Sequence, residues 1–156
     1  MLLSGFDIVM VIVCKYHIKY FIIYDIMEQI LDDESYSFLY KLTSKKIKQM
    51  NLKMLSELGL SSLIDKINNY IYVDELTELR HGTYMRWIDL NDPDNLVLTK
   101  GALYCDTKIN EDGVYLICKN FNSRNHFQIK LDECLLFRKL TDQELILLAA
   151  IDHVSK

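Results

Sequence analysis

Residues 102–120 read ALYCDTKINEDGVYLICKN, and this stretch decides the fold that the sequence predicts. Two runs rich in β-branched and aromatic residues flank Asn110–Gly113 (NEDG), whose composition is typical of a tight hairpin turn. We therefore predict two antiparallel strands, Ala102–Ile109 and Val114–Asn120, joined by this turn.

The length of the hairpin loop decides which cysteines face each other. A four-residue loop over Asn110–Gly113 places Ile109 opposite Val114 and Cys105 opposite Cys118. A loop one residue shorter places the two cysteines on opposite faces, because the side chains of a strand alternate. The sequence leaves both registers open.

Further short runs on either side of the hairpin have the composition of strands. They are Thr83–Leu90, Leu96–Thr99, Phe127–Leu131 and Leu135–Lys139. The segments Asn91–Asn95 and Asn122–Asn125 are turns by composition, and Lys100 with Gly101 is expected to be a bend or bulge. About five or six short strands joined mostly by short turns predict a small antiparallel β-barrel or a strongly bent sheet.

Helical patterns flank this β region, which makes the predicted fold class α+β. Thr141 and Glu144 form the T-x-x-E pattern of a capping box, so Thr141–Val154 is expected to be a C-terminal helix packed on the strands or the N-terminal helices. We expect a helical region over 27–73, followed by the barrel and its helix over 74–156. The expected N-terminal helices are Met27–Leu42, one that starts at Ser44 or Asn51 and ends near Gly59, and one that starts at Ser61 or Ser62 and carries the stripe Leu63, Ile64, Ile67, Tyr70 and Ile71.

The first 26 residues form an apolar leader that is interrupted by charges. Three interpretations stay open: a dispensable or mis-assigned leader with Met27 as the true start, additional strands at Ile8–Val13 and Phe21–Tyr24, or a membrane anchor. Lys15 and Lys19 interrupt the apolar run, and charges inside a membrane helix are costly. We predict that 1–26 is not needed for folding, and that the protein does not use a membrane unless this leader is an anchor.

Composition and motifs limit the class of protein. The chain has 156 residues, of which 50% are hydrophobic and 26% charged, with one proline and five glycines, so low-complexity and disordered classes are disfavoured. The net charge of −4 argues against a surface that binds nucleic acid all over. There is no phosphate-binding glycine loop and no protease, esterase or kinase motif. We therefore predict a non-enzymatic protein without catalytic, cofactor-binding or metal-binding residues.

Two groupings of reactive side chains have simpler explanations. None of the four cysteines has CxxC spacing, so reduced thiols are expected. Cys118 or Cys134 could form a nucleophile pair with His126, but scattered surface histidines explain the pattern as well. Asp89, Asp92 and Asp94 lie in an acidic turn. This turn lacks the glycine and the late glutamate of an EF-hand calcium loop, so an ordinary turn explains it.

Tyr84, Arg86 and Trp87 are the candidate partner-binding residues. On a strand, Tyr84 and Arg86 share one face and Trp87 takes the other. An exposed aromatic ring beside a guanidinium would suit a base or a peptide. The alternative is structural: Trp87 fills the core, and Arg86 pairs with Asp89 or Asp106.

A cluster of five lysines without an acid lies between residues 41 and 53. The candidate phosphate-binding residues are Lys41, Lys45, Lys46, Lys48 and Lys53. They would line a helical face toward phosphates, although a solvated helix face is the simpler interpretation. Because the rest of the protein is acidic, contact with nucleic acid there would be local and sensitive to salt.

The segment LRHGTYMRWIDL (79–90), followed by LTKG (98–101) and Cys105-Asp106, has a recognisable pattern. It resembles a group of short uncharacterised proteins of large nucleocytoplasmic DNA viruses that share L-x-x-G-x-Y-x-R-W-I, then L-T-x-G, then C-D. The matching residues are Leu79, Gly82, Tyr84, Arg86, Trp87, Ile88, Leu98, Thr99, Gly101, Cys105 and Asp106. The likeness covers about 74–154, half of the chain. It implies a viral origin and a setting in the infected-cell cytoplasm, at the viral factory, or in the virion, and it implies no activity.

Two hypotheses for function follow. The first is a non-enzymatic interaction protein of a large DNA virus, in which a small-barrel module binds a protein partner or a second copy of itself. The apolar surface of Thr141–Val154 is one candidate for self-association. The second is a nucleic-acid-binding accessory factor of viral gene expression that uses the Lys41–Lys53 cluster. Neither hypothesis requires a cofactor.

Overall fold

The computed structural model describes residues 43–154. Its elements, with η for 3₁₀ helices, are α3 (Ser44–Glu57), η2 (Ser61–Ile67), β1 (Tyr70–Tyr72), η3 (Leu76–Glu78), β2 (Tyr84–Asp89), β3 (Ala102–Asn110), β4 (Gly113–Lys119), β5 (His126–Lys130), η4 (Leu131–Glu133), β6 (Cys134–Lys139) and α4 (Asp142–Val154). The predictions for the leader, for Met27–Leu42 and for Lys41 lie outside these residues. The chain divides into two compact units, one of residues 50–139 and one that contains 43–49 and 140–154.

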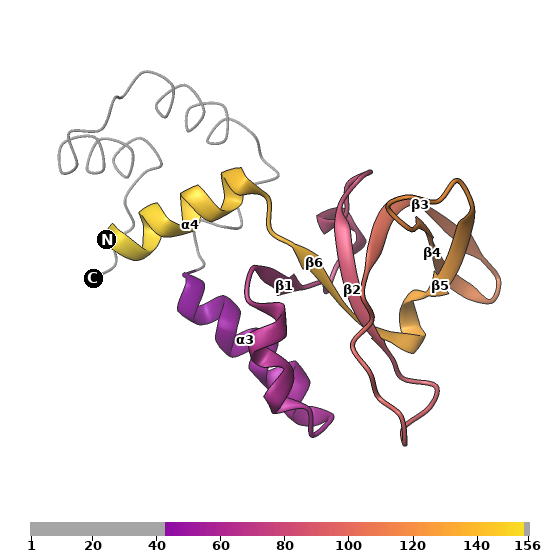
Figure 1. Ribbon diagram of the computed structural model, residues 1–156, viewed down its shortest axis with the longest axis horizontal. Coiled ribbons are helices and arrows are strands. Elements are labelled where there is room, and N and C mark those ends of the chain that lie inside the picture. The colour runs from indigo at the N-terminus through magenta and orange to yellow at the C-terminus, as the bar shows by residue number, and fades with distance from the viewer. Residues whose placement is uncertain (1–42, 155–156) are drawn as a thin grey trace. The chain divides into compact units, whose positions relative to one another are not determined.

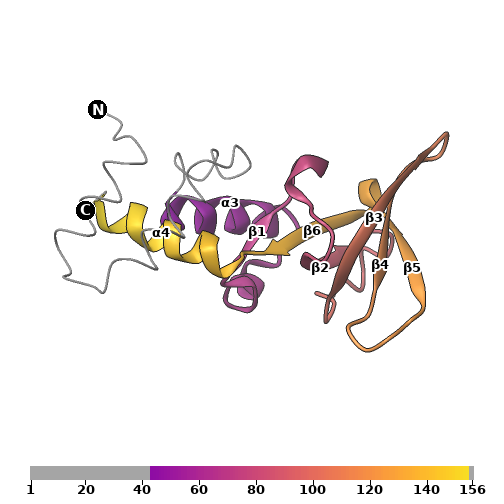
Figure 2. The ribbon, with the colours of Figure 1, turned by 90° about the horizontal axis from the view of Figure 1, so that it is seen from above.

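The six strands form one antiparallel sheet in the order β1-β6-β2-β3-β4-β5 (Figure 1). β1 and β5 are its edges and do not pair with each other, so the sheet is open and the predicted barrel is wrong. The α+β class with a C-terminal helix is confirmed. Closure would require β1 to pair with β5, and β1, with only three residues, offers little length for such pairing. Figure 2 shows that β3, β4 and β5 run in a different direction from β1 and β6.

β3 and β4 form the predicted hairpin. Ile109 lies opposite Val114, as expected for the four-residue loop. The two cysteines nevertheless do not face each other, because the register shifts near Cys105 and Tyr104 lies opposite Cys118. Cys105 is the extra residue of this β-bulge, which no local sequence signal announced.

Side-chain alternation gives the sheet two apolar faces. We call them the Met85 face, which also carries Trp87, and the Tyr84 face, which also carries Arg86 and Ile88. The buried cluster of the Met85 face contains Val73, Leu79, Met85, Ala102, Tyr104, Leu116, Cys118 and Leu136. The buried cluster of the Tyr84 face contains Leu55, Ile67, Ile88, Leu135 and Phe137, and it packs η2 and the end of α3 on the sheet.

Upstream of β2, the structure corrects one predicted helix. The stripe over Leu63–Ile71 begins as the 3₁₀ helix η2, but Tyr70–Tyr72 is a strand that pairs with β6. A Tyr-Ile-Tyr sequence has a high β propensity, and pairing with β6 outweighs the helical spacing. The helix before it, α3, begins at one of the two predicted starts, Ser44, and ends before Gly59.

Two other local predictions have mixed outcomes. The predicted strand Leu96–Thr99 is reduced to a single bridge between Leu98 and Ile88. In contrast, the N-terminus of α4 is capped as predicted, because the Thr141 hydroxyl accepts a hydrogen bond from the backbone N–H of Glu144 at 3.2 Å. Among residues 43–154, no helix is long and apolar enough to cross a membrane.

The unit that contains α4 buries the apolar side of this helix. Leu147, Leu148, Ala150 and Ile151 are buried, whereas Ile146 is exposed. The first turn of α3 reaches α4 through a hydrogen bond, since the backbone N–H of residue 44 donates to the Asp152 carboxylate at 2.9 Å. Self-association through α4 stays a prediction, and Ile146 is the exposed apolar side chain that would contribute to it.

Candidate functional site

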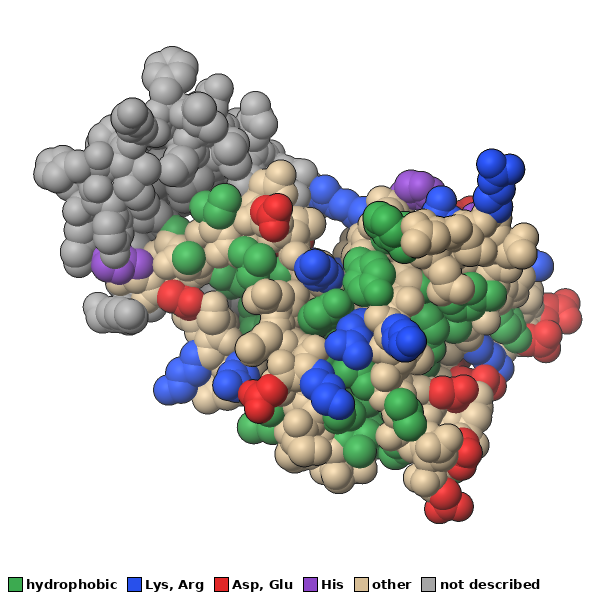
Figure 3. All heavy atoms as spheres, viewed as in Figure 1, with side chains coloured by type: hydrophobic (Ala, Val, Ile, Leu, Met, Phe, Trp, Pro, Cys, Tyr) green, Lys and Arg blue, Asp and Glu red, His purple; other side chains and the backbone are tan. Residues whose placement is uncertain are grey.

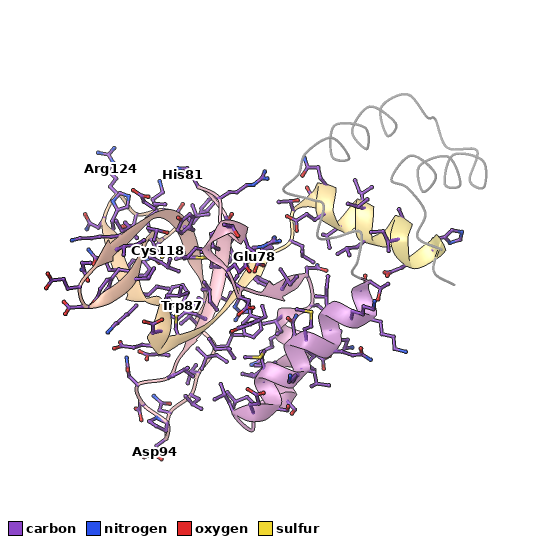
Figure 4. The ribbon with its side chains drawn as sticks, turned by 180° about the vertical axis from the view of Figure 1, so that it is seen from behind. Glu78, His81, Trp87, Asp94, Cys118 and Arg124 are labelled. Atoms are coloured by element: carbon purple, nitrogen blue, oxygen red, sulfur yellow. The ribbon has the colours of Figure 1, made fainter. Side chains whose placement is uncertain are left out.

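The three candidate partner-binding residues lie on β2 and divide between the two faces of the sheet. Trp87 is half-buried against the core of the Met85 face, and its ring centroid lies 6.0 Å from that of Phe127. Figure 4 shows Trp87 and Cys118 within the body of the molecule. Trp87 therefore has the core-packing role that the structural alternative predicted, and Tyr84 and Arg86 point to the opposite face.

Arg86 is held by backbone carbonyls. Its Nε donates to the carbonyl oxygen of Thr99 at 2.8 Å, and its Nη1 donates to the carbonyl oxygen of Lys66 at 3.0 Å. The predicted pairing with Asp89 or Asp106 is wrong. The physical reason is non-local: residues 98–101 run beside β2 and η2 lies near it, so the Thr99 and Lys66 carbonyls reach the guanidinium.

The L-T-x-G segment runs antiparallel beside β2, with Leu98 opposite Ile88 and Ala102 opposite Met85, and polar contacts fix it there. The Thr99 N–H donates to the Trp87 carbonyl oxygen at 2.9 Å, and the Trp87 N–H donates to Thr99 Oγ1 at 3.1 Å. The Tyr84 hydroxyl donates to the carbonyl oxygen of Lys100 at 2.8 Å. Gly101 then passes so close to β2 that an added Cβ would lie 2.6 Å from the Met85 carbonyl oxygen. The spacing of Tyr84, Thr99 and Gly101 in these two patterns thus has a structural explanation.

A transverse row of side chains crosses all six strands on the Tyr84 face. The register pairs Tyr70 with Lys139, Tyr84 with Leu103, Leu103 with Lys119, and Lys119 with His126. The β2–β6 register places Tyr84 next to Lys139. Directly paired residues point to the same side of a sheet, so these side chains form one line. We call this line the basic row: Tyr70, Lys139, Tyr84, Leu103, Lys119 and His126.

More cations flank the basic row. Lys66 and Lys100 are exposed, and their backbones hold Arg86 and Tyr84. Lys66, Lys100, Lys119 and Lys139 form no salt bridge within the described part of the chain. Figure 3 shows basic side chains gathered among hydrophobic ones in the middle of the face in view, with acidic side chains at its lower right.

The pKa of Tyr70 reflects its closeness to other aromatic and cationic groups of this face. Burial raises the pKa of Tyr70 above its ordinary value. The charge of Arg86 partly lowers this pKa again, and Tyr84 raises it slightly. Sequence reasoning found Tyr84 and Arg86 but missed Lys100, Lys119 and Lys139, because only the sheet register brings these three together.

The candidate phosphate-binding lysines that the structure describes lie on α3. Lys45, Lys46, Lys48 and Lys53 are exposed there. With about 100° of rotation per residue, the first three spread over about 160° of the helix circumference. They therefore do not form a narrow stripe. Lys41 lies outside the described residues.

The alternative of a nucleophile pair between Cys118 or Cys134 and His126 does not form, in line with the expectation of scattered histidines. Cys118 is buried on the Met85 face, whereas His126 belongs to the basic row on the other face. Burial raises the pKa of Cys118 and of Cys134 to about 12. Both thiols are therefore protonated at neutral pH, which makes them poor nucleophiles.

This protonation predicts low thiol reactivity in the folded chain. At pH 8 the thiolate fraction of Cys118 and Cys134 should be about a thousandfold lower than in the unfolded chain, since three pKa units separate the two states. Alkylation by iodoacetamide, followed by peptide mass spectrometry with and without urea, measures this ratio. The free energy of unfolding should also fall as pH rises from about 9 toward 12, because only the unfolded chain then loses these protons. Equal alkylation in both states would contradict the prediction.

The acidic turn forms a local hydrogen-bonded structure. The Asn91 N–H donates to Asp89 Oδ1 at 2.9 Å, and the Asn95 N–H donates to the Asp92 carbonyl oxygen at 3.1 Å. Figure 4 shows Asp94 at the tip of this loop. Within the described ranges, no three His, Cys, Asp or Glu side chains gather closely enough to hold a metal ion.

Comparison with known proteins finds no matching family model, no matching curated protein and no matching solved structure. The viral resemblance carried by Leu79–Leu90 therefore stays a prediction from the sequence.

Proposed function

We propose that this chain is a non-enzymatic interaction protein that binds an extended segment of a partner protein along β5. The observation that supports this proposal is the difference between the two sheet edges. At the β1 edge, the Asn51 amide donates to the Tyr70 carbonyl oxygen at 2.8 Å and accepts from the Tyr72 N–H at 3.0 Å. At the other edge, β5 pairs with β4 alone among the strands of residues 43–154. One edge is closed by a side chain and the other is open to strand addition.

The hairpin register indicates which backbone groups of β5 face outward. Gly113 and Asn110 close the turn, and bonded and non-bonded pairs alternate from there. Leu116 and Cys118 therefore bond toward β5, opposite Ile129 and Phe127. The other residues of β5 turn their backbone N–H and C=O groups toward solvent. They are His126, Gln128 and Lys130.

The side chains of β5 define the chemistry of the partner segment. Phe127 and Ile129 are half-buried at the rim of the Met85 face core. His126 and Lys130 lie on the opposite side of the same strand. A second copy of β5 in antiparallel pairing centred on Gln128 would place Lys130 opposite His126 and would offer no carboxylate to pair with it. The partner segment is therefore a different strand, with apolar residues alternating with acidic ones. With the viral resemblance, its source would be the infected cell or the virion.

A substitution in β5 tests this proposal. Gln128→Pro removes only an outward N–H, and proline is tolerated on a sheet edge in that orientation. Peptides selected from a displayed random library against the full chain should show alternating apolar and acidic residues. Their affinity, measured by calorimetry, should fall at least tenfold in Gln128→Pro and remain within twofold in the control Gln128→Thr. Peptides that bind Gln128→Pro as tightly as the unchanged chain would refute strand addition at β5.

A further inference from the structure

We infer that the basic row is a binding site for single-stranded nucleic acid. This inference goes beyond the proposed function, because it concerns the Tyr84 face and a different class of ligand. It rests on three observations: the continuity of the row across the sheet, the unpaired lysines within and beside it, and the aromatic rings between them.

The row has the dimensions of an extended strand of nucleic acid. Neighbouring strands lie about 4.8 Å apart, so a line across six of them is about 24 Å long. Right-handed twist turns this line into a shallow diagonal path along the sheet surface. Such a path can track the backbone of several nucleotides, within the range that small β modules bind.

The lysine side chains on this path are available to bind phosphate groups. Lys119 and Lys139 lie in the row, and Lys66 and Lys100 lie beside it. None of these four lysines forms a salt bridge within residues 43–154. The chain as a whole carries a net charge of −4, so binding to phosphates would depend on local groups of lysines such as this one. Toward the hairpin tip, the next row contains Asp106, which limits the site on that side.

The apolar members of the row favour a single strand over a duplex. Tyr70, Tyr84 and Leu103 are half-buried. One edge of the Tyr84 ring packs on Gly101 and its hydroxyl bonds to Lys100, so stacking would use the remaining exposed surface of these three side chains. Unpaired bases can stack on such surfaces, and each stacked base contributes about 1–3 kcal/mol. A duplex hides the faces of its bases and could use only the lysines.

The test measures the binding of a fluorescein-labelled 20-mer of thymidine to the full chain by fluorescence anisotropy. Four lysine contacts predict a slope of log K against log salt near −2.8, at about −0.7 per contact. Binding should then weaken about 50-fold between 50 and 200 mM NaCl. A 20-base-pair duplex should bind at least fivefold more weakly than the single strand at 50 mM NaCl.

Lys139 is exposed and Lys119 is half-buried, so substitution of either should leave the fold intact. Lys119→Gln and Lys139→Gln should each weaken binding several-fold and reduce the slope by about 0.7. Lys119→Arg should restore binding, because it keeps the charge. Lys53→Gln, on the exposed side of α3, is the matched control and should leave binding unchanged.

Several results would overturn the inference. These are absent or salt-independent binding, equal affinity for duplex and single strand, or a loss in Lys53→Gln as large as that in Lys139→Gln. The last result would place the contact on α3 instead. The two proposals can fail separately, since Gln128→Pro should keep oligonucleotide binding and Lys139→Gln should keep peptide binding.

Discussion

Gly101→Ala should destabilise the protein more than any other single-methyl addition among its described glycines. The backbone of Gly101 has a φ of +107°, which L-amino acids rarely adopt. A Cβ there would lie 2.6 Å from the Met85 carbonyl oxygen and 2.8 Å from two atoms of the Tyr84 ring system. Backbone strain and overpacking together should cost about 3 kcal/mol or more. Thermal unfolding of the full chain should show a Tm about 10 °C lower.

Gly59→Ala is the matched control for this prediction. Gly59 also has a positive φ, +72°, but no atom lies within 4 Å of its added Cβ. It should therefore cost only the intrinsic penalty of the left-handed conformation, about 1 kcal/mol. The difference between the two variants isolates the close approach of residues 99–101 to β2. Equal Tm values for Gly101→Ala and Gly59→Ala would contradict this account.

The sequence predicts the hairpin well because its signals are local. The NEDG turn and the two β-prone runs contact each other within a few residues, so composition alone identifies them. The bulge at Cys105 is different, since it depends on how the loop before β2 packs. The N–H of Gly82 donates to the Tyr104 carbonyl oxygen at 2.8 Å, and His81 Nδ1 lies 2.9 Å from the Cys105 carbonyl oxygen.

The topology of the sheet could not be predicted in the same way. A count of short strands is equally compatible with a barrel and with an open sheet. Non-local strand pairs determine the topology. The most important are those of β6, the last strand in sequence, which lies between β1 and β2. β1 itself is only Tyr70–Tyr72, and its residues also fit a helical stripe. Such a strand is recognisable only once its partner is known.

Only part of the candidate site could be predicted, because sequence reveals local motifs but not the register of the sheet. Tyr84 and Arg86 were found because they are adjacent in a distinctive motif, and both lie at the basic row or beside it. Lys100, Lys119 and Lys139 lie at or near strand ends far apart in sequence, so only the register unites them. A search for lysines at the ends of predicted strands would have been the available signal.

Asn51→Leu should have the second large effect on stability. Asn51 is 2% exposed, and its amide makes both hydrogen bonds that close the β1 edge. Leucine has the same number of side-chain heavy atoms and a somewhat larger volume, but it would leave the Tyr70 carbonyl and the Tyr72 N–H without partners in a part-buried setting. An unsatisfied buried group costs about 1–3 kcal/mol, so two of them should cost about 2–4 kcal/mol in total. The Tm should fall by about 10 °C.

Hydrogen exchange distinguishes this cause from a general loss of packing. The amide of Tyr72 should exchange much faster in Asn51→Leu, relative to the amides of the β3–β4 hairpin, because its acceptor is Asn51 Oδ1. Gln49→Leu, an exposed amide-to-leucine change on the same helix, should leave both the Tm and this exchange rate within error. If Asn51→Leu slowed exchange at Tyr72 or matched Gln49→Leu in Tm, the amide would not be closing the edge. The contrast between β1 and β5, on which the proposed function depends, would then lose its basis.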